Sequence, residues 1–189
     1  MAELDNRRFV VDSLLKTKRE GMEDLIDAMD EWGFFKAPCS GSYHLACEFG
    51  LLHHTRHVME FGEKIGVALL GGAEYNKIQD SVVISTALHD LGKCGQFGKP
   101  NYIPNILSSG EQSKPKPFIT NPDLLYVAHE IRSISMAQMY IDLTEEEQFA
   151  ILYHNGMYSP LKYDLSGKET PLQMIVHWAD MWACRVIEK

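Results

Sequence analysis

The chain has 189 residues, 45% of them hydrophobic, and a formal net charge of −8. This length fits one domain whose core needs no disulfide or metal to hold it together. The negative charge argues against a protein that binds duplex nucleic acid, although one site on an acidic protein can still be locally positive. No apolar run is long enough to span a bilayer, and charges interrupt the N-terminal segment where a signal peptide needs apolar residues. We therefore expect a cytoplasmic protein with no membrane partner, and the composition leaves homo-oligomerisation open.

The chain contains four cysteines, and no two of them form a CxxC pair. In a cytoplasmic protein such cysteines are expected to be reduced and mostly buried. They are Cys39, Cys47, Cys94 and Cys184.

The N-terminal half is dominated by the helical period. Apolar residues recur at helical spacing over residues 22–29, and Gly33 follows as a stop signal. Residues 34–47 contain proline and glycine without this period and are expected to form a loop. The helical pattern returns over residues 49–70 and again over residues 74–92, where we expect two further helices.

A long segment rich in Pro, Gly, Ser and Lys separates these helices from the C-terminal half. A segment of this kind, over about residues 94–121, predicts either a long working loop or a small hairpin between helices. Three later helices are predicted from their start signals. Asn121 is followed by a proline and an acid, Thr144 begins a capping box, and Thr170 is again followed by proline. No segment shows convincing strand alternation, so we expect an all-α fold.

Each of five predicted helices places a histidine or an aspartate among apolar neighbours. Buried groups of this kind cost free energy unless they are paired or bound to a cation. Several helices that each donate one or two such side chains are what a metal centre inside a helical bundle requires, and imidazole with carboxylate suits Zn, Mn, Fe or Co. These residues are His53, His54, His57, His89, Asp90, His129, His154, His177 and Asp180.

Not all of these residues are expected to be ligands. A single histidine on an apolar face is more often a hydrogen-bonded core residue, which we expect for His57 and His177. Asp180 lies in the apolar sequence WADMWA, where a carboxylate needs a cation or a dense hydrogen-bond network. His89 and Asp90 are neighbours that point about 100° apart on a helix, so they can share an ion only if the helix end faces it edge-on. The second oxygen of Asp90 would then be free to bridge to a second metal.

The motifs GLLHHT, TALHDLGK, HE, YHNG and HWADMWA follow one another in the order H…HD…H…H…D. This order resembles the HD superfamily of metal-dependent phosphohydrolases from about residue 34 to the end of the chain. It is similar in particular to the HD domain of YhaM-type exoribonucleases and to small stand-alone HD proteins. The resemblance implies a single domain over residues 1–189, with a helical segment at 1–33 and an HD-domain helical bundle at 34–189.

The resemblance also implies a set of metal ligands. In it, a first divalent ion is bound by His54, His89, Asp90 and Asp180, and a second by His129 and His154 with Asp90 as the bridge. The two ions would be Fe, Mn, Zn or Co. Two positions depart from the family pattern: Asn155 replaces a second histidine, and Phe49 replaces a glycine close to the site.

The chemistry implied is hydrolysis of a phosphate ester by a metal-bridged hydroxide, which Asp90 would position. Lys93 lies one helical turn after His89 and is expected to contact the phosphate, with a solvated helix-end lysine as the alternative. The remaining predicted substrate contacts are His44, Arg132 and Tyr158. For His44 the alternative is a hydrogen-bonded loop histidine, and for Arg132 it is a surface salt bridge.

The expected activity is therefore that of a phosphohydrolase acting on a small phosphorylated substrate, a nucleotide. A 3′–5′ exoribonuclease or phosphodiesterase is the enzymatic alternative, which the acidic charge disfavours because it repels a nucleic-acid strand. A diiron oxygenase on the same ligands and a degenerate HD domain that only binds a nucleotide are further alternatives.

Overall fold

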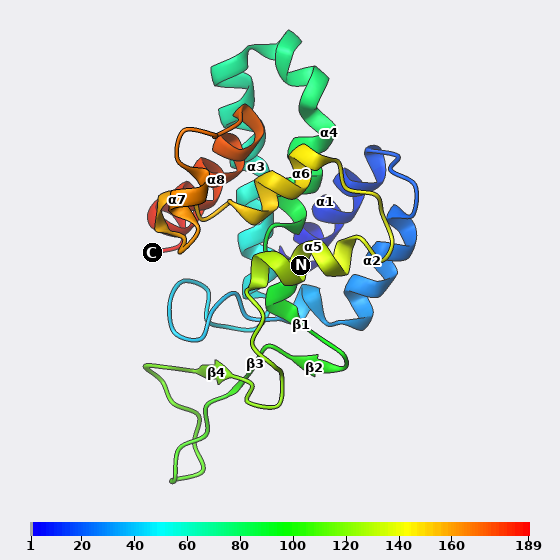
Figure 1. Ribbon diagram of the computed structural model, residues 1–189. Coiled ribbons are helices and arrows are strands. Elements are labelled where there is room, and N and C mark those ends of the chain that lie inside the picture. Colours follow the sequence, from blue (N-terminus) through cyan, green and yellow to red (C-terminus); the bar gives the residue numbers. More distant parts are fainter. Residues whose placement is uncertain (1) are drawn as a thin grey trace.

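Within residues 2–189, the part of the chain that the computed structural model describes, there are eight α-helices and two small two-stranded sheets (Figure 1). The helices are α1 (Ala2–Lys16), α2 (Met22–Glu31), α3 (Gly50–Leu70), α4 (Gly72–Leu88), α5 (His129–Ala137), α6 (Glu145–Leu152), α7 (Lys162–Leu165) and α8 (Pro171–Trp182). The fold is mainly helical, which confirms the main part of the expected all-α class. It is not purely α-helical, because it contains four short strands. None of the helices in residues 2–189 is long and apolar enough to cross a membrane.

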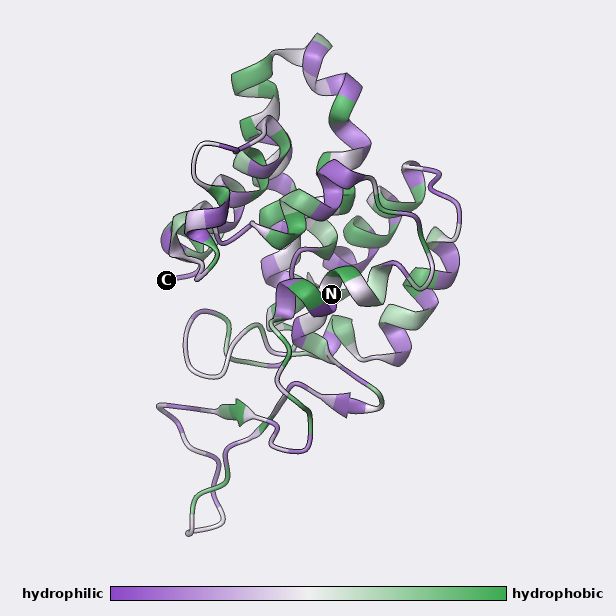
Figure 2. Cartoon of the chain, in the orientation of Figure 1, coloured by the Kyte–Doolittle hydropathy of each residue, from purple (hydrophilic) through white to green (hydrophobic). Residues whose placement is uncertain are grey.

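The centre of the fold is the pair α3 and α4, which lie side by side and are joined by a turn at Gly71 (Figure 1). Helix α8 packs along α3, and α6 packs between α4 and α8. Hydrophobic and hydrophilic residues alternate in short stretches along the helices, as amphipathic packing requires (Figure 2). This arrangement brings the inner faces of α3, α4, α6 and α8 toward one another.

Two apolar clusters flank the place where these helices meet. The larger one joins α1, α2, α3 and α4, with Leu14, Leu25, Leu51 and Leu88 fully buried in it. The smaller one fills the space between α4, α6 and α8. Because Leu14 of α1 and Leu25 of α2 are part of the larger cluster, the segment 1–33 shares its core with the rest of the chain.

Several helix boundaries follow their sequence signals. Helix α2 ends just before Gly33, whose φ of 76° is left-handed. Thr144 caps α6 in a capping box with Glu147, and Thr170 caps α8 ahead of a proline at the first turn. These predictions are confirmed because each rests on a local signal that needs no distant partner: a side-chain bond to the backbone for Thr144 and Thr170, and a left-handed backbone for Gly33.

Two predicted boundaries are wrong. The helix expected over residues 74–92 ends at Leu88, and a 3₁₀ turn, η2 (Leu91–Cys94), follows it. No helix starts at Asn121, since its side chain accepts from the Asp123 amide and donates to the Pro100 carbonyl, which fixes a turn. Residues 124–128 then run without helical structure to α5.

The segment between η2 and α5 contains both sheets. Strands β1 (Gly95–Gln96) and β2 (Lys99–Pro100) form a tight antiparallel hairpin, and β3 (Tyr102–Pro104) pairs antiparallel with β4 (Phe118–Thr120). The second pair is the small hairpin expected between residues 94 and 121, and the first was not expected. The turn between β1 and β2 is Phe97–Gly98, where both φ angles are positive, at 56° and 69°.

All four cysteines are free. Cys39 and Cys94 are buried, Cys184 is half-buried and Cys47 is exposed. The expectation of reduced thiols fits this arrangement, and the expectation that most are buried holds fully for two of them.

Candidate metal centre

Six side chains from five separate elements meet at the inner end of α3, and we call them the His/Asp centre. His54 comes from α3, His89 and Asp90 follow α4, His129 begins α5, His154 follows α6, and Asp180 lies on α8. They form three overlapping groups whose ligand atoms lie within 4.8 Å of one another: His54–His89–Asp90, His89–His154–Asp180 and Asp90–His129–His154. These six are the predicted metal ligands, and such groups have the composition and spacing to bind a metal ion.

Asp90 lies at the middle of the centre. Its Oδ2 is 3.4 Å from Nε2 of both His54 and His89, and its Oδ1 is 3.2 Å from Nε2 of His129 and 3.6 Å from that of His154. Both oxygens are buried. Oδ2 forms an ion pair with Nζ of Lys93 at 2.6 Å, and Oδ1 accepts no hydrogen bond of good geometry from the residues described. The early end of α4 explains this position. Asp90 has φ −108° and ψ 11°, so the backbone has already left the helical conformation at this residue.

The tautomers of two histidines follow from their partners. Nδ1 of His89 donates to the Thr86 carbonyl at 2.8 Å, and Nδ1 of His154 donates to the Ile151 carbonyl at 2.8 Å. A carbonyl can only accept, so a neutral ring there carries its proton on Nδ1 and has a lone pair on Nε2. These lone pairs point at the oxygens of Asp90, which is a repulsive arrangement that a cation between them would make favourable. The residues present therefore fit a metal.

The other imidazole nitrogens of the centre also lie close together. Nε2 of His54 lies 3.2 Å from Nε2 of His89, and Nε2 of His129 lies 3.3 Å from that of His154. Asp180 adds a second carboxylate, with Oδ1 3.2 Å from Nε2 of His54. The centre thus contains two imidazole pairs, one facing each oxygen of the same aspartate.

Charge is distributed in the centre as a divalent cation requires. Burial would raise the pKa of Asp90, but the charge of Lys93 beside it holds it well below its usual range. Burial also opposes ionisation of Asp180, yet a hydrogen bond from His54 keeps its pKa low. Burial lowers the pKa of His154 to about 3, so this ring stays neutral and its lone pair stays available.

Glu188 is a carboxylate beside the centre that the sequence did not reveal. It follows the π-helical turn η4 (Ala183–Ile187), and its side chain is fully buried. One carboxylate oxygen lies 3.0 Å from Nδ1 of His54, and the other accepts from Nδ1 of His57 at 2.8 Å. Burial opposes its charge, but the bonds from these histidines lower its pKa to about 2. A carboxylate behind a ligand histidine fixes the ring and its tautomer.

The two histidines expected to be non-ligands lie at the edge of the centre. His57 binds Glu188, and Nδ1 of His177 donates to the His154 carbonyl at 2.7 Å. Neither belongs to a potential metal-binding group. Asn155 places its amide nitrogen 3.2 Å from Nε2 of His154 and also donates to Glu130 at 2.7 Å.

Lys93 connects the centre to a pocket. Its Nζ lies 2.6 Å from Oδ2 of Asp90, while its side chain remains 17% exposed. The pocket measures about 150 Å³ and is lined by Lys93 and His129 on one side and by the two-sheet segment on the other, through Tyr102, Thr120 and Tyr126. Burial raises the pKa of Tyr102, so this phenol stays neutral and can donate a hydrogen bond.

The other three predicted substrate contacts lie elsewhere. Arg132 is buried, and its guanidinium donates to Oε1 of Gln96 and to the Leu125 carbonyl, each at 2.8 Å. Tyr158 is 68% exposed, with the guanidinium of Arg185 over its ring. His44 lies in the loop before α3, next to Cys39 and His54. None of these three lines the pocket beside Lys93.

Ser133 connects the segment that carries His89 to the helix that carries His129. Ser133 of α5 accepts from the Gly92 amide at 2.8 Å and donates to the His89 carbonyl at 3.0 Å. The backbone of Gly92 packs so closely on α5 that a Cβ there would collide with the His129 carbonyl oxygen. The contact of Gly92 with α5 and the hydrogen bonds of Ser133 therefore fix His89 and His129 relative to each other.

The chain was compared with protein-family models, with curated proteins and with solved structures, and none of the three comparisons finds a match. The arrangement of the side chains is thus the evidence on function: a buried cluster of histidines and aspartates that could bind metal ions, next to a small pocket.

Proposed function

We propose that the chain is a metal-dependent phosphohydrolase with an HD-type helical bundle, acting on a small phosphate ester, most simply a nucleotide. The observation that carries the proposal is Asp90, whose two buried oxygens each face a different pair of histidine nitrogens. A carboxylate in this position suits a bridge between two cations, because Oδ1 faces two histidine nitrogens without accepting a hydrogen bond of good geometry from the described residues, while Oδ2 pairs with Lys93.

In this proposal the ligands divide into two sets that share Asp90. His54, His89 and Asp180 belong to one set, and His129 and His154 belong to the other. Divalent ions bound there would lower the pKa of a bound water and stabilise the charge that develops on phosphorus. The residues of the chain keep the ligands in one tautomer, exclude bulk water through burial and place the substrate.

Lys93 is the residue proposed to contact the substrate phosphate. Its ammonium group is at the boundary between Asp90 and the pocket, so a phosphate that approaches the centre from the pocket meets it first. Burial would lower the pKa of Lys93, but Asp90 beside it keeps that pKa well above its usual range, so the lysine is charged at neutral pH. Arg132 would act on the pocket wall through Leu125 rather than on the substrate.

The net charge of the chain, with a small pocket, favours a small phosphate ester over a nucleic-acid strand. A cavity of about 150 Å³ accommodates one small aromatic ring. A strand needs an extended groove with basic side chains, whereas this chain has a net charge of −8. We therefore place the exoribonuclease activity second.

The test is reconstitution of metal-depleted protein with Mn²⁺, Fe²⁺, Zn²⁺ or Co²⁺, followed by measurement of phosphate release from a panel of nucleotides. We expect about two ions per chain, because two ligand sets share Asp90, and phosphate release with at least one metal. The matched variant is His129→Gln, and the control is His53→Gln, since His53 lies outside the groups that could bind metal and bonds Asn6.

Binding of fewer than one ion per chain would refute the dinuclear centre. Metal binding without phosphate release from any nucleotide would refute the substrate class, and oxygen consumption by the Fe²⁺ form would favour the oxygenase instead.

A further inference from the structure

Each ligand histidine of the His/Asp centre has a second ring nitrogen, whose partner affects how strongly the ring binds a metal. In all four rings Nε2 is the nitrogen near Asp90, so Nδ1 is left for a partner behind the ring. In His89 and His154 this partner is a backbone carbonyl. A carboxylate there also supplies negative charge, which makes the ring a stronger ligand. The groups beside Nδ1 of His54 and of His129 are therefore important for metal affinity.

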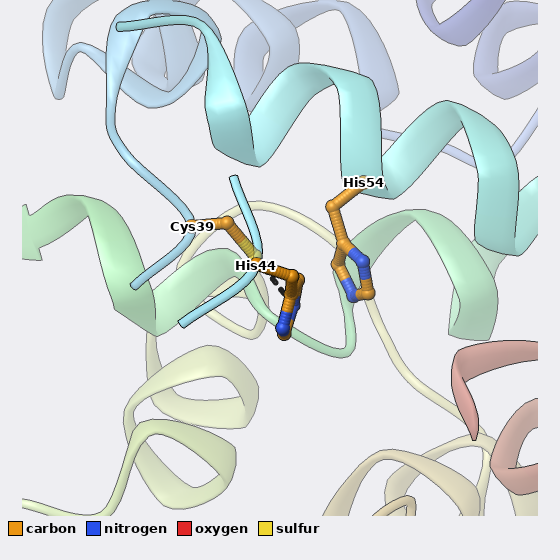
Figure 3. A group of neighbouring side chains, drawn as sticks. All are labelled: Cys39, His44 and His54. Atoms are coloured by element: carbon orange, nitrogen blue, oxygen red, sulfur yellow. Dashed lines mark hydrogen bonds between the residues drawn. The ribbon is translucent and has the colours of Figure 1, made fainter. Parts of the chain in front are cut away.

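His54, in the first ligand set, has a carboxylate in this position. One oxygen of Glu188 lies 3.0 Å from its Nδ1. Figure 3 shows two other neighbours of the His54 ring, Cys39 and His44, which come from the loop before α3. Burial raises the pKa of the Cys39 thiol to about 11, so this thiol is neutral at pH 7. Glu188 thus supplies the negative charge behind His54.

The second ligand set has a matching carboxylate, Glu130. It follows His129 in the first turn of α5, its side chain is 11% exposed, and its Oε2 lies 3.4 Å from Nδ1 of His129. Its other oxygen accepts from the amide nitrogen of Asn155 at 2.7 Å, and that nitrogen lies 3.2 Å from Nε2 of His154. Glu130 therefore contacts one ligand of the second set directly and reaches the other through Asn155.

The orientation of Asn155 follows from this contact. A carboxylate oxygen accepts hydrogen bonds and cannot donate them, so the group that faces Glu130 is the amide NH₂. A donor does not bind a cation, and Asn155 in this orientation connects Glu130 to His154 without joining the ligands.

The second set also has less negative charge of its own. A divalent ion in the first set would meet two ligand carboxylates, Asp90 and Asp180, whereas an ion in the second set would meet the shared Asp90 and two imidazoles. A carboxylate just outside the ligands offsets part of the remaining positive charge. Glu130 is placed to do this.

We propose that Glu130 is a positioning residue that sets the metal affinity of the second ligand set, His129 and His154 with the shared Asp90. The inference rests on the proposed function and adds which residue controls the second ion. Glu130 belongs to none of the potential metal-binding groups of the described residues and does not line the pocket beside Lys93. Its effect therefore passes through the ligands and not through the substrate.

The competing explanation is a purely structural role. An acid in the first turn of α5 interacts favourably with the helix dipole, and the bond to Asn155 joins α5 to the turn after α6. A structural role would lower the stability of the metal-free protein and leave its metal affinity unchanged.

The test is calorimetric titration of metal-depleted protein with Mn²⁺, with the bound ions counted by elemental analysis. Glu130→Gln keeps an acceptor for Asn155 but removes the charge. We expect one of the two ions to bind about 10–100-fold more weakly, while the other ion and the thermal unfolding of the metal-free protein stay as in the wild type. Glu145→Gln, exposed at the start of α6, is the matched control.

A second background identifies which ion is affected. His129→Gln removes a ligand of the second set, so adding Glu130→Gln to it must leave the affinity of the remaining ion unchanged. A further loss of affinity in this background would overturn the inference. Wild-type affinities in Glu130→Gln, for one ion or for two, would overturn it as well, even with normal phosphate release. If Glu130→Gln weakens one ion but no nucleotide is hydrolysed, the proposed substrate class fails and the role of Glu130 stands.

Discussion

The two sides of the candidate site are built differently. On the helical side, His54, His89 and Asp90 are buried side chains on or just after long helices that pack on one another. On the pocket side, residues 95–128 form strands of two or three residues, and Tyr126 is 89% exposed. Ligands for a metal need fixed positions, whereas a wall that meets a substrate tolerates movement. Under the proposed function, the helices would determine the chemistry and the two-sheet segment would determine which substrate reaches the centre.

The largest expected effect comes from the centre of the helical side. Asp90→Asn keeps the shape of the side chain but removes the charge that both histidine pairs face. We expect phosphatase activity to fall by at least about 10³-fold, with loss of bound metal, measured by phosphate release and elemental analysis. Asp142→Asn, an exposed aspartate, is the matched control. A variant that retains both metal and activity would place the reaction elsewhere.

A smaller effect is expected for Glu188, whose carboxylate contacts the proposed ligand His54. Glu188→Gln keeps an acceptor for His54 but removes the charge that strengthens it as a ligand. Metal affinity should fall by about 10–100-fold, measured by titration of activity with the metal. Glu146→Gln, on the exposed face of α6, should leave the titration unchanged. Equal curves for Glu188→Gln and the wild type would mean that Glu188 does not support His54.

The stability of the helical side rests partly on Glu147. Its buried carboxylate binds Arg19 at 2.7 Å and Ser81 at 2.8 Å and closes the capping box of α6. Burial opposes its charge, but the bond from Arg19 keeps its pKa below the usual value. Glu147→Gln should lower the free energy of unfolding by about 2 kcal/mol at neutral pH.

Acid should remove this advantage of Glu147. A carboxylate whose pKa is lowered in the folded state stabilises above its unfolded pKa, about 4.3, and loses that contribution as the pH falls through the folded value. Denaturation of wild type and Glu147→Gln should therefore converge in acid. A difference that grows on acidification would contradict the assigned ion pair.

The smallest effect is expected on the pocket side. Tyr126→Ser removes an exposed aromatic ring from the pocket wall, so stability should change by no more than about 0.5 kcal/mol. KM for the substrate should rise severalfold while kcat and metal content stay constant. Tyr163→Ser, equally exposed on α7, is the control that should change neither. A fall in kcat without a change in KM would mean that this wall takes part in the reaction.

The sequence points to the candidate residues because each interrupts a predicted apolar helix face, and the resemblance to the HD superfamily selects the six proposed ligands among them. Asp180 among tryptophans and His54 among leucines are visible without knowing any distance. Helix starts at Thr144 and Thr170 are equally local. The early end of α4 cannot be seen in the sequence, because the bonds that fix His89 and Gly92 come from Ser133 on a distant helix.

Glu188 shows why the rest could not be predicted. In the sequence RVIEK it resembles any charged residue at the end of a helix. Only a π-helical turn and the packing of this segment against α3 bring it under His54. The pocket depends in the same way on tertiary contacts, since Arg132 joins α5 to Gln96 and Leu125 across the segment that forms its wall.

The contact between Gly92 and α5 also limits how this chain can vary. Any side chain at position 92 would push against the His129 carbonyl and the Cβ of Arg132, one next to a metal ligand and the other at the support of the pocket wall. Substitutions there would disturb both parts of the site at once, and no single compensating change could restore both. Position 92 should therefore accept fewer amino acids in a saturation library than the buried apolar position of Leu91 before it.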